Sequence, residues 1–138
     1  MQDATNPPST VVAVIVFIMY IATIQQIVGA SMSPTYESQD IVILNKLHYI
    51  FFDVKRFDVV SFEYDSTKYL IKRVIGLPGD KVEYKDNVLY INDKKIEEEY
   101  LSKDTQTENF SLMDLGYEVI PKDMYLVLGD NREDSLDS

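Results

Sequence analysis

Two kinds of side chain in this sequence could together cleave a peptide bond: a lysine in an apolar segment and a serine beside a proline. Lys72 lies in the segment 68–75. Alternate side chains share one face of an extended chain, so Leu70 and Val74 would flank it. Burial among aliphatic side chains disfavours the charged form of an amine, and a neutral amine can take a proton from a serine hydroxyl. The alternation alone favours the other interpretation, a lysine whose amine reaches solvent from a strand edge.

The serines that could partner this lysine lie in the segment Ser31-Met32-Ser33-Pro34-Thr35. Pro34 disfavours a helical conformation for the preceding residue and keeps Ser33 extended. A rigid turn at this place would hold a serine oxygen in a fixed position for attack on a carbonyl group. Ser31 and Ser33 are both candidate nucleophiles on this reasoning.

The composition excludes several other chemistries. The 138 residues carry 23 acidic and 13 basic side chains, a net charge of −10 that would repel nucleic-acid phosphates and anionic lipids. The chain has no cysteine, which excludes thiolate catalysis and zinc–thiolate sites. His48 is the only histidine and no nucleophile motif adjoins it, so we interpret it as a structural or surface residue. We therefore expect no metal, no cofactor and no nucleic-acid partner, and a base other than histidine in any serine hydrolase.

The N-terminal part contains the longest uncharged apolar run. No charged residue occurs between Asp3 and Glu37, and residues 11–24 are almost wholly apolar. Extended to residues 9–28, the run is long enough for a helix that crosses about 30 Å of hydrocarbon. We therefore predict a transmembrane helix over residues 11–28.

Two alternatives to this membrane anchor are open. A buried helix of a soluble protein normally keeps a charged outer face, which this run lacks. A cleavable export signal would fit the segment Val28-Gly29-Ala30, but residues 1–10 contain no lysine or arginine, which such signals have. The first basic residue is Lys46, so loop charge does not indicate the orientation of the anchor.

From Asp40 onward, short β-rich runs alternate with turns, which predicts a mostly β protein folded as antiparallel sheet. The predicted strands cover residues 41–44, 58–64, 68–75, 82–84, 88–91, 94–96 and 124–128, with turns at Lys85-Asp86-Asn87 and Asn92-Asp93. Residues 97–117 are polar and weakly patterned, so we expect a loop-rich insertion there. We divide the chain into an N-terminal tail (1–10), an anchor (11–28), the first part of a core (29–80), a small insertion (81–121) and the return to the core (122–138).

One further apolar segment, Tyr49-Ile50-Phe51-Phe52, has two interpretations. It could contact the surface of a bilayer, or it could be a strand of the core.

Three segments in this order resemble the type I (bacterial) signal peptidases, membrane-anchored serine proteases that use lysine as their base. They are Ser31-Met32-Ser33-Pro34-Thr35, Lys72-Arg73-Val74-Ile75-Gly76-Leu77-Pro78-Gly79-Asp80 and Gly129-Asp130-Asn131-Arg132-Glu133-Asp134-Ser135-Leu136-Asp137-Ser138. The resemblance implies an antiparallel β catalytic core with a small β insertion, preceded by an N-terminal transmembrane helix. It also implies a single-pass enzyme of the cell membrane, with its catalytic domain on the extracytoplasmic side, that removes signal peptides from exported preproteins.

The resemblance also implies roles for individual residues. Ser31 would be the nucleophile, with its backbone N–H as one oxyanion-hole donor, and Lys72 would be the general base. Ser135 would hydrogen-bond the lysine amine and orient it. An ionic scaffold that holds the two catalytic segments together would consist of Asp130, Arg132 and Asp137.

Substrate contacts follow from the same resemblance. An extended substrate would pair with backbone near residues 25–29 and with the strand 68–72. Met32 would line a shallow pocket that admits alanine. In some relatives a serine supplies a second oxyanion-hole donor where this chain has Gly29, which has no side chain.

Two other functions are weighed against this one. Other Ser-Lys proteases, such as the self-cleaving SOS repressors, lack a membrane anchor and need a DNA-binding domain. The sequence meets neither condition, which disfavours this function. Relatives continue past the position of Ser138 with an arginine, a glycine and further strands, so the resemblance implies that this chain is truncated there. The alternative function is therefore a catalytically inactive, membrane-anchored β-domain adaptor of the same fold.

Overall fold

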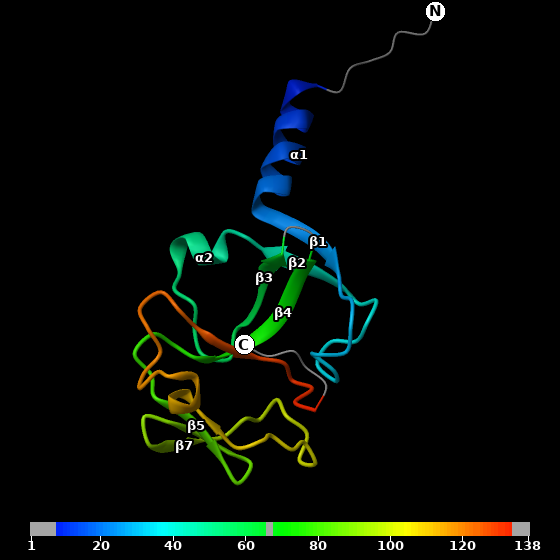
Figure 1. Ribbon diagram of the computed structural model, residues 1–138. Coiled ribbons are helices and arrows are strands. Elements are labelled where there is room, and N and C mark those ends of the chain that lie inside the picture. The colour runs from blue at the N-terminus through cyan, green and yellow to red at the C-terminus, as the bar shows by residue number, and fades with distance from the viewer. Residues whose placement is uncertain (1–7, 66–67, 134–138) are drawn as a thin grey trace, which may run out of the picture.

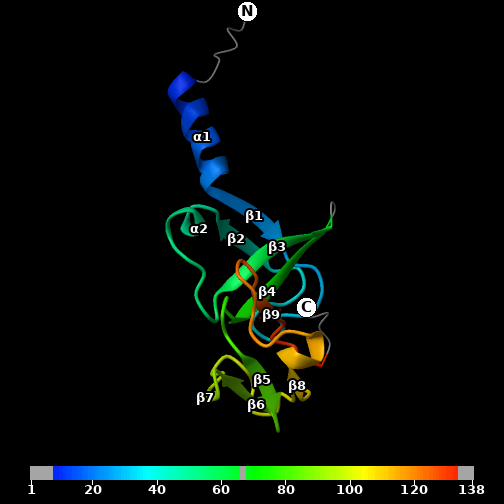
Figure 2. The same cartoon turned by 60° about the vertical axis from the view of Figure 1, so that its left-hand side comes forward.

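The computed structural model of the chain describes residues 8–65 and 68–133. In chain order its elements are α1 (Ser9–Ile21), β1 (Ala22–Gln26), β2 (Ile41–Asn45), α2 (His48–Phe51), β3 (Val59–Asp65), β4 (Lys68–Gly76), β5 (Val82–Lys85), β6 (Val88–Ile91), β7 (Lys94–Ile96), β8 (Phe110–Ser111), the 3-10 helix η1 (Leu112–Leu115) and β9 (Leu126–Leu128). Figures 1 and 2 show α1 projecting from one end of the molecule and β5–β8 at the opposite end, with β3 and β4 between them.

The strands form three antiparallel sheets within the described residues: β1-β2, β3-β4-β9 and β7-β6-β5-β8. The predicted mostly β, antiparallel fold is thus confirmed. Strand β9 returns beside β4, with Leu128 opposite Arg73. This pairing places the last part of the described chain next to the strand that carries Lys72.

The hairpin turns of the predicted meander lie where the sequence placed them. Asp86 and Asn87 join β5 to β6, and Asn92 and Asp93 join β6 to β7. All four residues have positive φ, between 51° and 63°. Positive φ at both central residues defines the type I′ turn, whose twist matches that of a hairpin and which Asn and Asp tolerate well.

The predicted helix over residues 11–28 ends earlier than the sequence indicated. Helix α1 stops at Ile21, and the next five residues form β1, which pairs with β2 from Ala22↔Asn45 to Gln26↔Ile41. A continuous apolar run does not distinguish a helix from a strand, and the hydrogen bonds that β2 offers decide the conformation here. No helix in the described part of the chain has both the length and the apolar character needed to cross a membrane.

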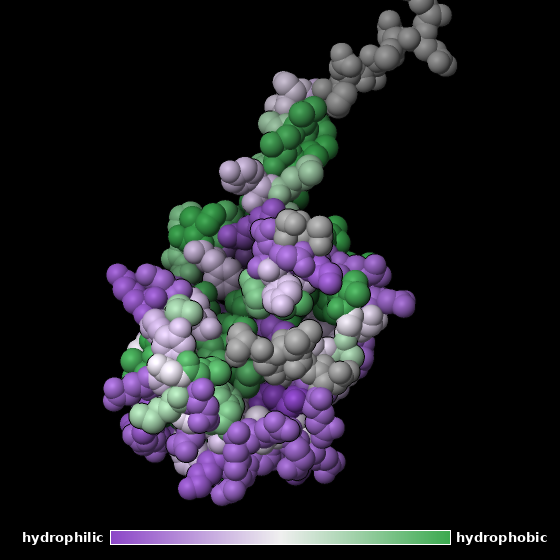
Figure 3. Space-filling view, viewed as in Figure 1, coloured by the Kyte–Doolittle hydropathy of each residue, from purple (hydrophilic) through white to green (hydrophobic). Residues whose placement is uncertain are grey.

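Helix α1 buries none of its side chains against the rest of the molecule. Apolar residues along it are therefore exposed, Phe17 by 65% and Met19 by 67%. Figure 3 shows this apolar stalk above a body whose lower part is mostly hydrophilic.

The segment 49–52 is not a core strand. Residues 48–51 form the short helix α2, and Tyr49, Ile50, Phe51 and Phe52 are all exposed. The core-strand interpretation is therefore wrong.

The hydrophobic core lies between the insertion sheet and the ends of β4 and β9. Its fully buried members are Ile75, Val82, Tyr84, Leu89, Ile91, Leu112, Ile120, Leu126 and Leu128. Gly76 allows the close approach at this junction, because a Cβ there would lie 2.3 Å from Ile120 Cδ1 and 2.9 Å from Val82 Cγ2. The insertion is thus packed firmly against the end of the strand that carries Lys72.

Candidate active site

Residues 27–40 form a loop whose two ends are bonded to each other. The Ile27 N–H donates to the Asp40 carbonyl oxygen, and the Gln39 N–H donates to the Ile27 carbonyl oxygen, both at 2.8 Å. Met32 is only 2% exposed and anchors the loop in the protein. The loop that carries the candidate serines therefore has a fixed base and a buried anchor.

Ser31 is held against the segment that follows β9. The Asn131 N–H donates to the Ser31 carbonyl oxygen at 3.0 Å, and the Asn131 side chain donates to the Ala30 carbonyl oxygen at 3.2 Å. Ser33, the other candidate nucleophile, donates its hydroxyl to the carboxylate of Glu37 at 2.8 Å. Ser31 is thus joined through its backbone to the segment after β9, whereas the Ser33 side chain bonds within its own loop.

Lys72 is buried in β4, with only 2% of its surface exposed. It lies opposite Val60 of β3, and β4 is buried continuously over residues 72–76. The strand is therefore covered on both of its faces at this point, and the surface position considered from the sequence is excluded for this lysine.

Asp130 links the strand of Lys72 to the loop of Ser31. Its carboxylate accepts two hydrogen bonds from Arg73, Nε at 2.8 Å and Nη2 at 2.6 Å, and its side chain is fully buried. The same carboxylate accepts a hydrogen bond from the Thr35 hydroxyl. One buried aspartate thus joins both candidate catalytic segments.

The Arg73 guanidinium stays charged in this buried position. Burial acts to lower the pKa of Arg73, but the hydrogen bonds and the negative charge of Asp130 outweigh it and raise the pKa above its ordinary value. Arg73 also donates to the Phe57 carbonyl oxygen at 2.9 Å. A bidentate, fully hydrogen-bonded pair of this kind is geometrically specific.

Arg132 pairs with the insertion instead. Within the described residues its carboxylate partner is Glu98, at 2.5 Å, and the two side chains are 2% and 9% exposed. It also donates to the hydroxyl groups of Tyr84 (2.9 Å) and Thr107 (3.0 Å) and to the Gly129 carbonyl oxygen (2.9 Å). Arg132 therefore fastens the segment after β9 to the insertion sheet, whereas Asp130 fastens it to the core.

Tyr100 connects these two arginines. Its ring lies beneath the Arg73 guanidinium, 4.1 Å from ring centroid to Cζ, and its hydroxyl donates to Glu98. Burial, followed by the charge of Glu98, raises the pKa of Tyr100, so this hydroxyl stays protonated and can donate. The described parts of the site form one network of charge and hydrogen bonds.

The remaining predicted residues divide into two groups. Ser135 and Asp137 lie outside the described residues. Gly29 has a φ of 102°, and its N–H donates to the Ser38 hydroxyl at 3.4 Å. A Cβ at Gly29 would meet nothing within 4 Å, so the backbone conformation and not the available space favours glycine here.

Several residues of the network had no role in the sequence-based prediction. Glu98 and Tyr100 lie in the weakly patterned segment 97–117, and Arg73 and Thr35 stand inside the recognised motifs without an assigned function. The acidic and aromatic content of the 97–100 segment is the only local signal, and it does not identify a partner far along the chain.

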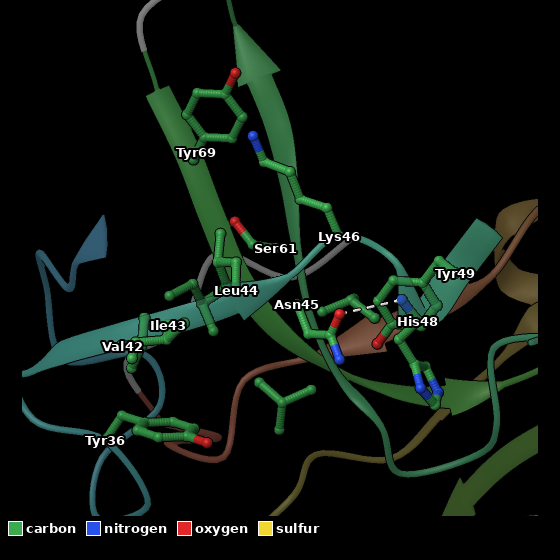
Figure 4. A pocket seen from close by; sticks show the side chains of 13 residues that line it. Tyr36, Val42, Ile43, Leu44, Asn45, Lys46, His48, Tyr49, Ser61 and Tyr69 are labelled. Carbon is green, nitrogen blue, oxygen red and sulfur yellow. Dashed lines mark hydrogen bonds between the residues drawn. The ribbon is translucent and has the colours of Figure 1, made fainter. Parts of the chain in front are cut away.

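A pocket of about 520 Å³ lies among β2, α2, β3 and β4, and no residue of this network lines it. Tyr36, from the loop of Ser31, and Ile71, next to Lys72, both line it. Figure 4 shows Tyr69 and Lys46 at one end of the pocket and Tyr36 at the other. The Ser61 hydroxyl, also in its wall, donates to the Gln25 side chain at 3.1 Å. An extended, mostly apolar peptide would fit such a space.

The chain matches, over residues 8–138, the family model described as signal peptidase, peptidase S26. Signal peptidase I of Bacillus caldolyticus and Signal peptidase I V of Bacillus subtilis are each 42% identical to it over 118 residues, or 80% of this chain. Signal peptidase IB of Staphylococcus aureus is 42% identical over 139 residues, or 91% of this chain. The crystal structure of a signal peptidase I from Enterococcus faecalis V583 aligns with a TM-score of 0.55 and 39% identity, covering 62% of this chain and 84% of that one.

The chain spans 65%, 70% and 73% of the lengths of these Bacillus caldolyticus, Bacillus subtilis and Staphylococcus aureus relatives. The family match nevertheless extends over almost the whole chain and includes both candidate catalytic segments. The chain belongs to the signal peptidase family, peptidase S26.

Proposed function

We propose that this chain is a serine endopeptidase that removes N-terminal signal peptides from exported preproteins. The relatives named signal peptidase I support this reaction. The proposal that Ser31 and Lys72 act together rests on Asp130, which links their two segments. It binds Arg73, which follows Lys72 in β4, and it accepts a hydrogen bond from Thr35, in the loop of Ser31.

In the proposed reaction, the Ser31 hydroxyl oxygen attacks the carbonyl carbon of the scissile peptide bond. The amine of Lys72 takes the hydroxyl proton and later returns it to the leaving amine. Water then hydrolyses the acyl-enzyme ester and frees Ser31. The Ser31 N–H is the proposed first donor to the oxyanion, and another backbone N–H or a water replaces the side chain that Gly29 lacks.

The substrate is proposed to bind as an extended strand beside β4. Strand β9 pairs with β4 only from Arg73 onward, so within the described residues the stretch 68–72 has strand pairing with β3 alone. We propose that the peptide adds to this edge of β4 and to residues 25–29. We propose Met32 as part of the smaller pocket for an alanine side chain.

Signal peptidase I enzymes are membrane enzymes. We propose that α1 holds this chain in the cell membrane as a single-pass anchor, with the sheets on the extracytoplasmic side. The exposed apolar side chains of α1 and the absence of charge between residues 8 and 36 support this placement. Preproteins and lipid are thus the proposed partners.

Cleavage of a preprotein whose signal ends in Ala-x-Ala tests the proposed reaction. The detergent-solubilised chain is compared with its Ser31→Ala, Lys72→Ala and Ser33→Ala variants. We expect Ser31→Ala and Lys72→Ala each to lower kcat by at least about 10³-fold, because each removes a reacting group. Ser33→Ala is the matched control and should cleave at nearly the unmodified rate, because its hydroxyl binds Glu37.

Near-normal cleavage by Lys72→Ala would exclude lysine as the base. A Ser33→Ala variant that alone lost activity would move the nucleophile to Ser33. Specific binding of the preprotein without cleavage by the unmodified chain would instead favour the inactive adaptor.

A further inference from the structure

The β3-β4-β9 sheet carries another pocket, of about 410 Å³, on the face to which Lys72 projects. Val60 lies directly opposite Lys72 on β3, and Val74 follows Lys72 by two positions on β4, so both valines share its face. Val74 is in turn opposite Val127 of β9. All three valines line the pocket, so the pocket begins at the cross-strand neighbour of the proposed base.

The lining of this pocket is apolar. It consists of Tyr49, Val54, Val60, Ser61, Phe62, Val74, Tyr125 and Val127, none of which is charged. Val74 and Val127 are 1% and 9% exposed, whereas Tyr49 and Tyr125 are each 43% exposed. A pocket that combines buried valines with a more open rim accepts an aliphatic or aromatic side chain and disfavours a charged one.

The loop that carries Val54 is bonded to β4. The Phe57 N–H donates to the Val74 carbonyl oxygen at 2.7 Å, and the Val74 N–H donates to the Asp58 carbonyl oxygen at 2.9 Å. The Asp58 carboxylate accepts a hydrogen bond from the Lys55 N–H at 2.9 Å. This wall of the pocket is therefore held in place by the strand that carries the proposed base.

The pairing of β9 determines where a bound chain can continue. In the proposed binding mode, signal residues pair with the free edge of β4, which ends at Lys72 because β9 occupies that edge from Arg73 onward. The residues after the scissile bond must therefore leave the edge toward one face of the sheet. On the face of Arg73 the space is occupied, since its guanidinium binds Asp130 and lies over Tyr100, and Leu128 opposite is 5% exposed. The open face is the one with the pocket.

We infer that this pocket binds an apolar side chain of the mature protein, at the second or third residue after the scissile bond. The inference rests on the proposed function, because Ser31 and Lys72 define where that bond lies. Val74 is two residues beyond Lys72, and an extended peptide advances by about 3.3 Å per residue, as β4 does, which sets the position. Cleavage would then depend on the start of the mature chain as well as on the signal peptide.

Peptides that share one signal segment ending in Ala-x-Ala test the inference on the unmodified chain. The second and third residues of the mature part are each changed to Leu, Ala, Lys or Asp, and all other residues are kept. We expect Leu at one of these two positions to raise kcat/KM about tenfold over Ala, since an apolar pocket discriminates by at least roughly this factor per methylene group. Lys and Asp at the same position should be cleaved more slowly than Ala.

Val54 allows the preference of the pocket to be reversed. Val54→Glu places a carboxylate in the pocket wall, so it should lower kcat/KM for the Leu peptide and raise it about tenfold for the Lys peptide. Val119→Glu is the matched control, because Val119 is 43% exposed, does not line the pocket and undergoes the same change of charge. It should keep the unmodified preference for Leu over Lys.

Photo-cross-linking locates the bound peptide without cleavage. The Ser31→Ala variant is irradiated with a peptide that carries p-benzoylphenylalanine at the favoured mature position, and the linked residues are identified by mass spectrometry. We expect links to Val54, Tyr125 or Val127, and their loss when the Leu peptide is added in excess. The same probe at the third residue before the scissile bond is the control and should link elsewhere.

The outcomes separate this inference from the proposed function. Cleavage that is indifferent to both mature positions, one peptide preference shared by Val54→Glu and Val119→Glu, or links outside the pocket would overturn the pocket and leave the proposed function intact. No cleavage of any peptide by the unmodified chain would overturn the proposed function and this inference with it. If circular dichroism shows that Val54→Glu does not fold, the peptide series and the cross-links decide.

Discussion

Asp130 is the residue on which the proposed active site depends most directly after the nucleophile and the base. It is fully buried and satisfies the Arg73 guanidinium and the Thr35 hydroxyl together. Removing one partner of such a buried pair leaves an uncompensated charge, which costs more than the pair itself contributes. The position of Ser31 relative to Lys72 is therefore sensitive to a residue that need not touch the substrate.

We expect Asp130→Asn to lower the free energy of unfolding by about 3 kcal/mol and to abolish most of the cleavage, because it leaves Arg73 charged and buried beside a neutral amide. Urea unfolding followed by circular dichroism measures the first effect, and the preprotein assay measures the second. Asp93→Asn is the control, since it makes the same change in the exposed Lys81–Asp93 pair, where little effect is expected. Equal stability of the two variants would contradict the linking role of Asp130.

At the scale of elements, the turn after β4 is held by one carboxylate. Asp80 accepts hydrogen bonds from the Leu77 N–H (2.8 Å) and the Asn92 side chain (2.9 Å), and it forms an ion pair with Arg56 at 3.0 Å. It thus joins the end of β4 to a turn of the insertion. Burial acts to raise the pKa of Asp80, but these hydrogen bonds and the Arg56 charge hold it below its ordinary value.

A carboxyl group whose pKa is lower in the folded state stabilises the fold above its unfolded pKa, about 3.9 for aspartate. That stabilisation disappears as the pH falls through the folded value. We therefore expect Asp80→Asn to be less stable than the unmodified chain at pH 7, with a difference that shrinks as the pH falls below about 4. Urea midpoints at several pH values measure this difference. A difference that stayed constant with pH would mean that the ionised form of Asp80 has no special role.

The elements also show which parts of the fold the sequence could predict. The strands from β2 to β7 and the turns at Asp86-Asn87 and Asn92-Asp93 follow from local patterns that tertiary contacts reinforce. The end of α1 does not, because the residues after Ile21 are uncharged like those before it and only pairing with β2 makes them a strand. Helix α2 is a single turn, too short for any periodic pattern.

At the scale of the whole molecule, the insertion and the core are joined through Tyr100. The ring contacts Arg73 of the core, and the hydroxyl contacts Glu98, the partner of Arg132. The Arg132–Glu98 pair joins residues 34 positions apart in the sequence, and the Arg73–Asp130 pair joins residues 57 positions apart. The motifs identified the predicted catalytic residues Ser31 and Lys72. No local pattern could predict the long-range contacts of Arg73, Tyr100 and Arg132.

The ring and the hydroxyl of Tyr100 can be separated by substitution. We expect Tyr100→Phe to lose the hydrogen bond to Glu98 and the longer one from Arg132, about 1–2 kcal/mol of stability in total, and to keep most of its kcat. Tyr100→Ala should lose about 3 kcal/mol or more and lower kcat strongly, because it also removes the ring that supports Arg73. Chemical denaturation and single-turnover cleavage measure the two effects. If the Phe variant were as damaged as the Ala variant, the hydroxyl and not the ring would be the essential part.

The pairing of β9 with β4 has a consequence for the order of assembly. Strand β9 continues into Gly129 to Arg132, and it pairs with β4 as far as Gly76, against which Ile120 and Val82 pack closely. A newly made chain can therefore possess both its serine loop and its lysine strand while the aspartate that unites them is still absent. Proteolytic activity would then appear only after the insertion strands β5–β7 have folded.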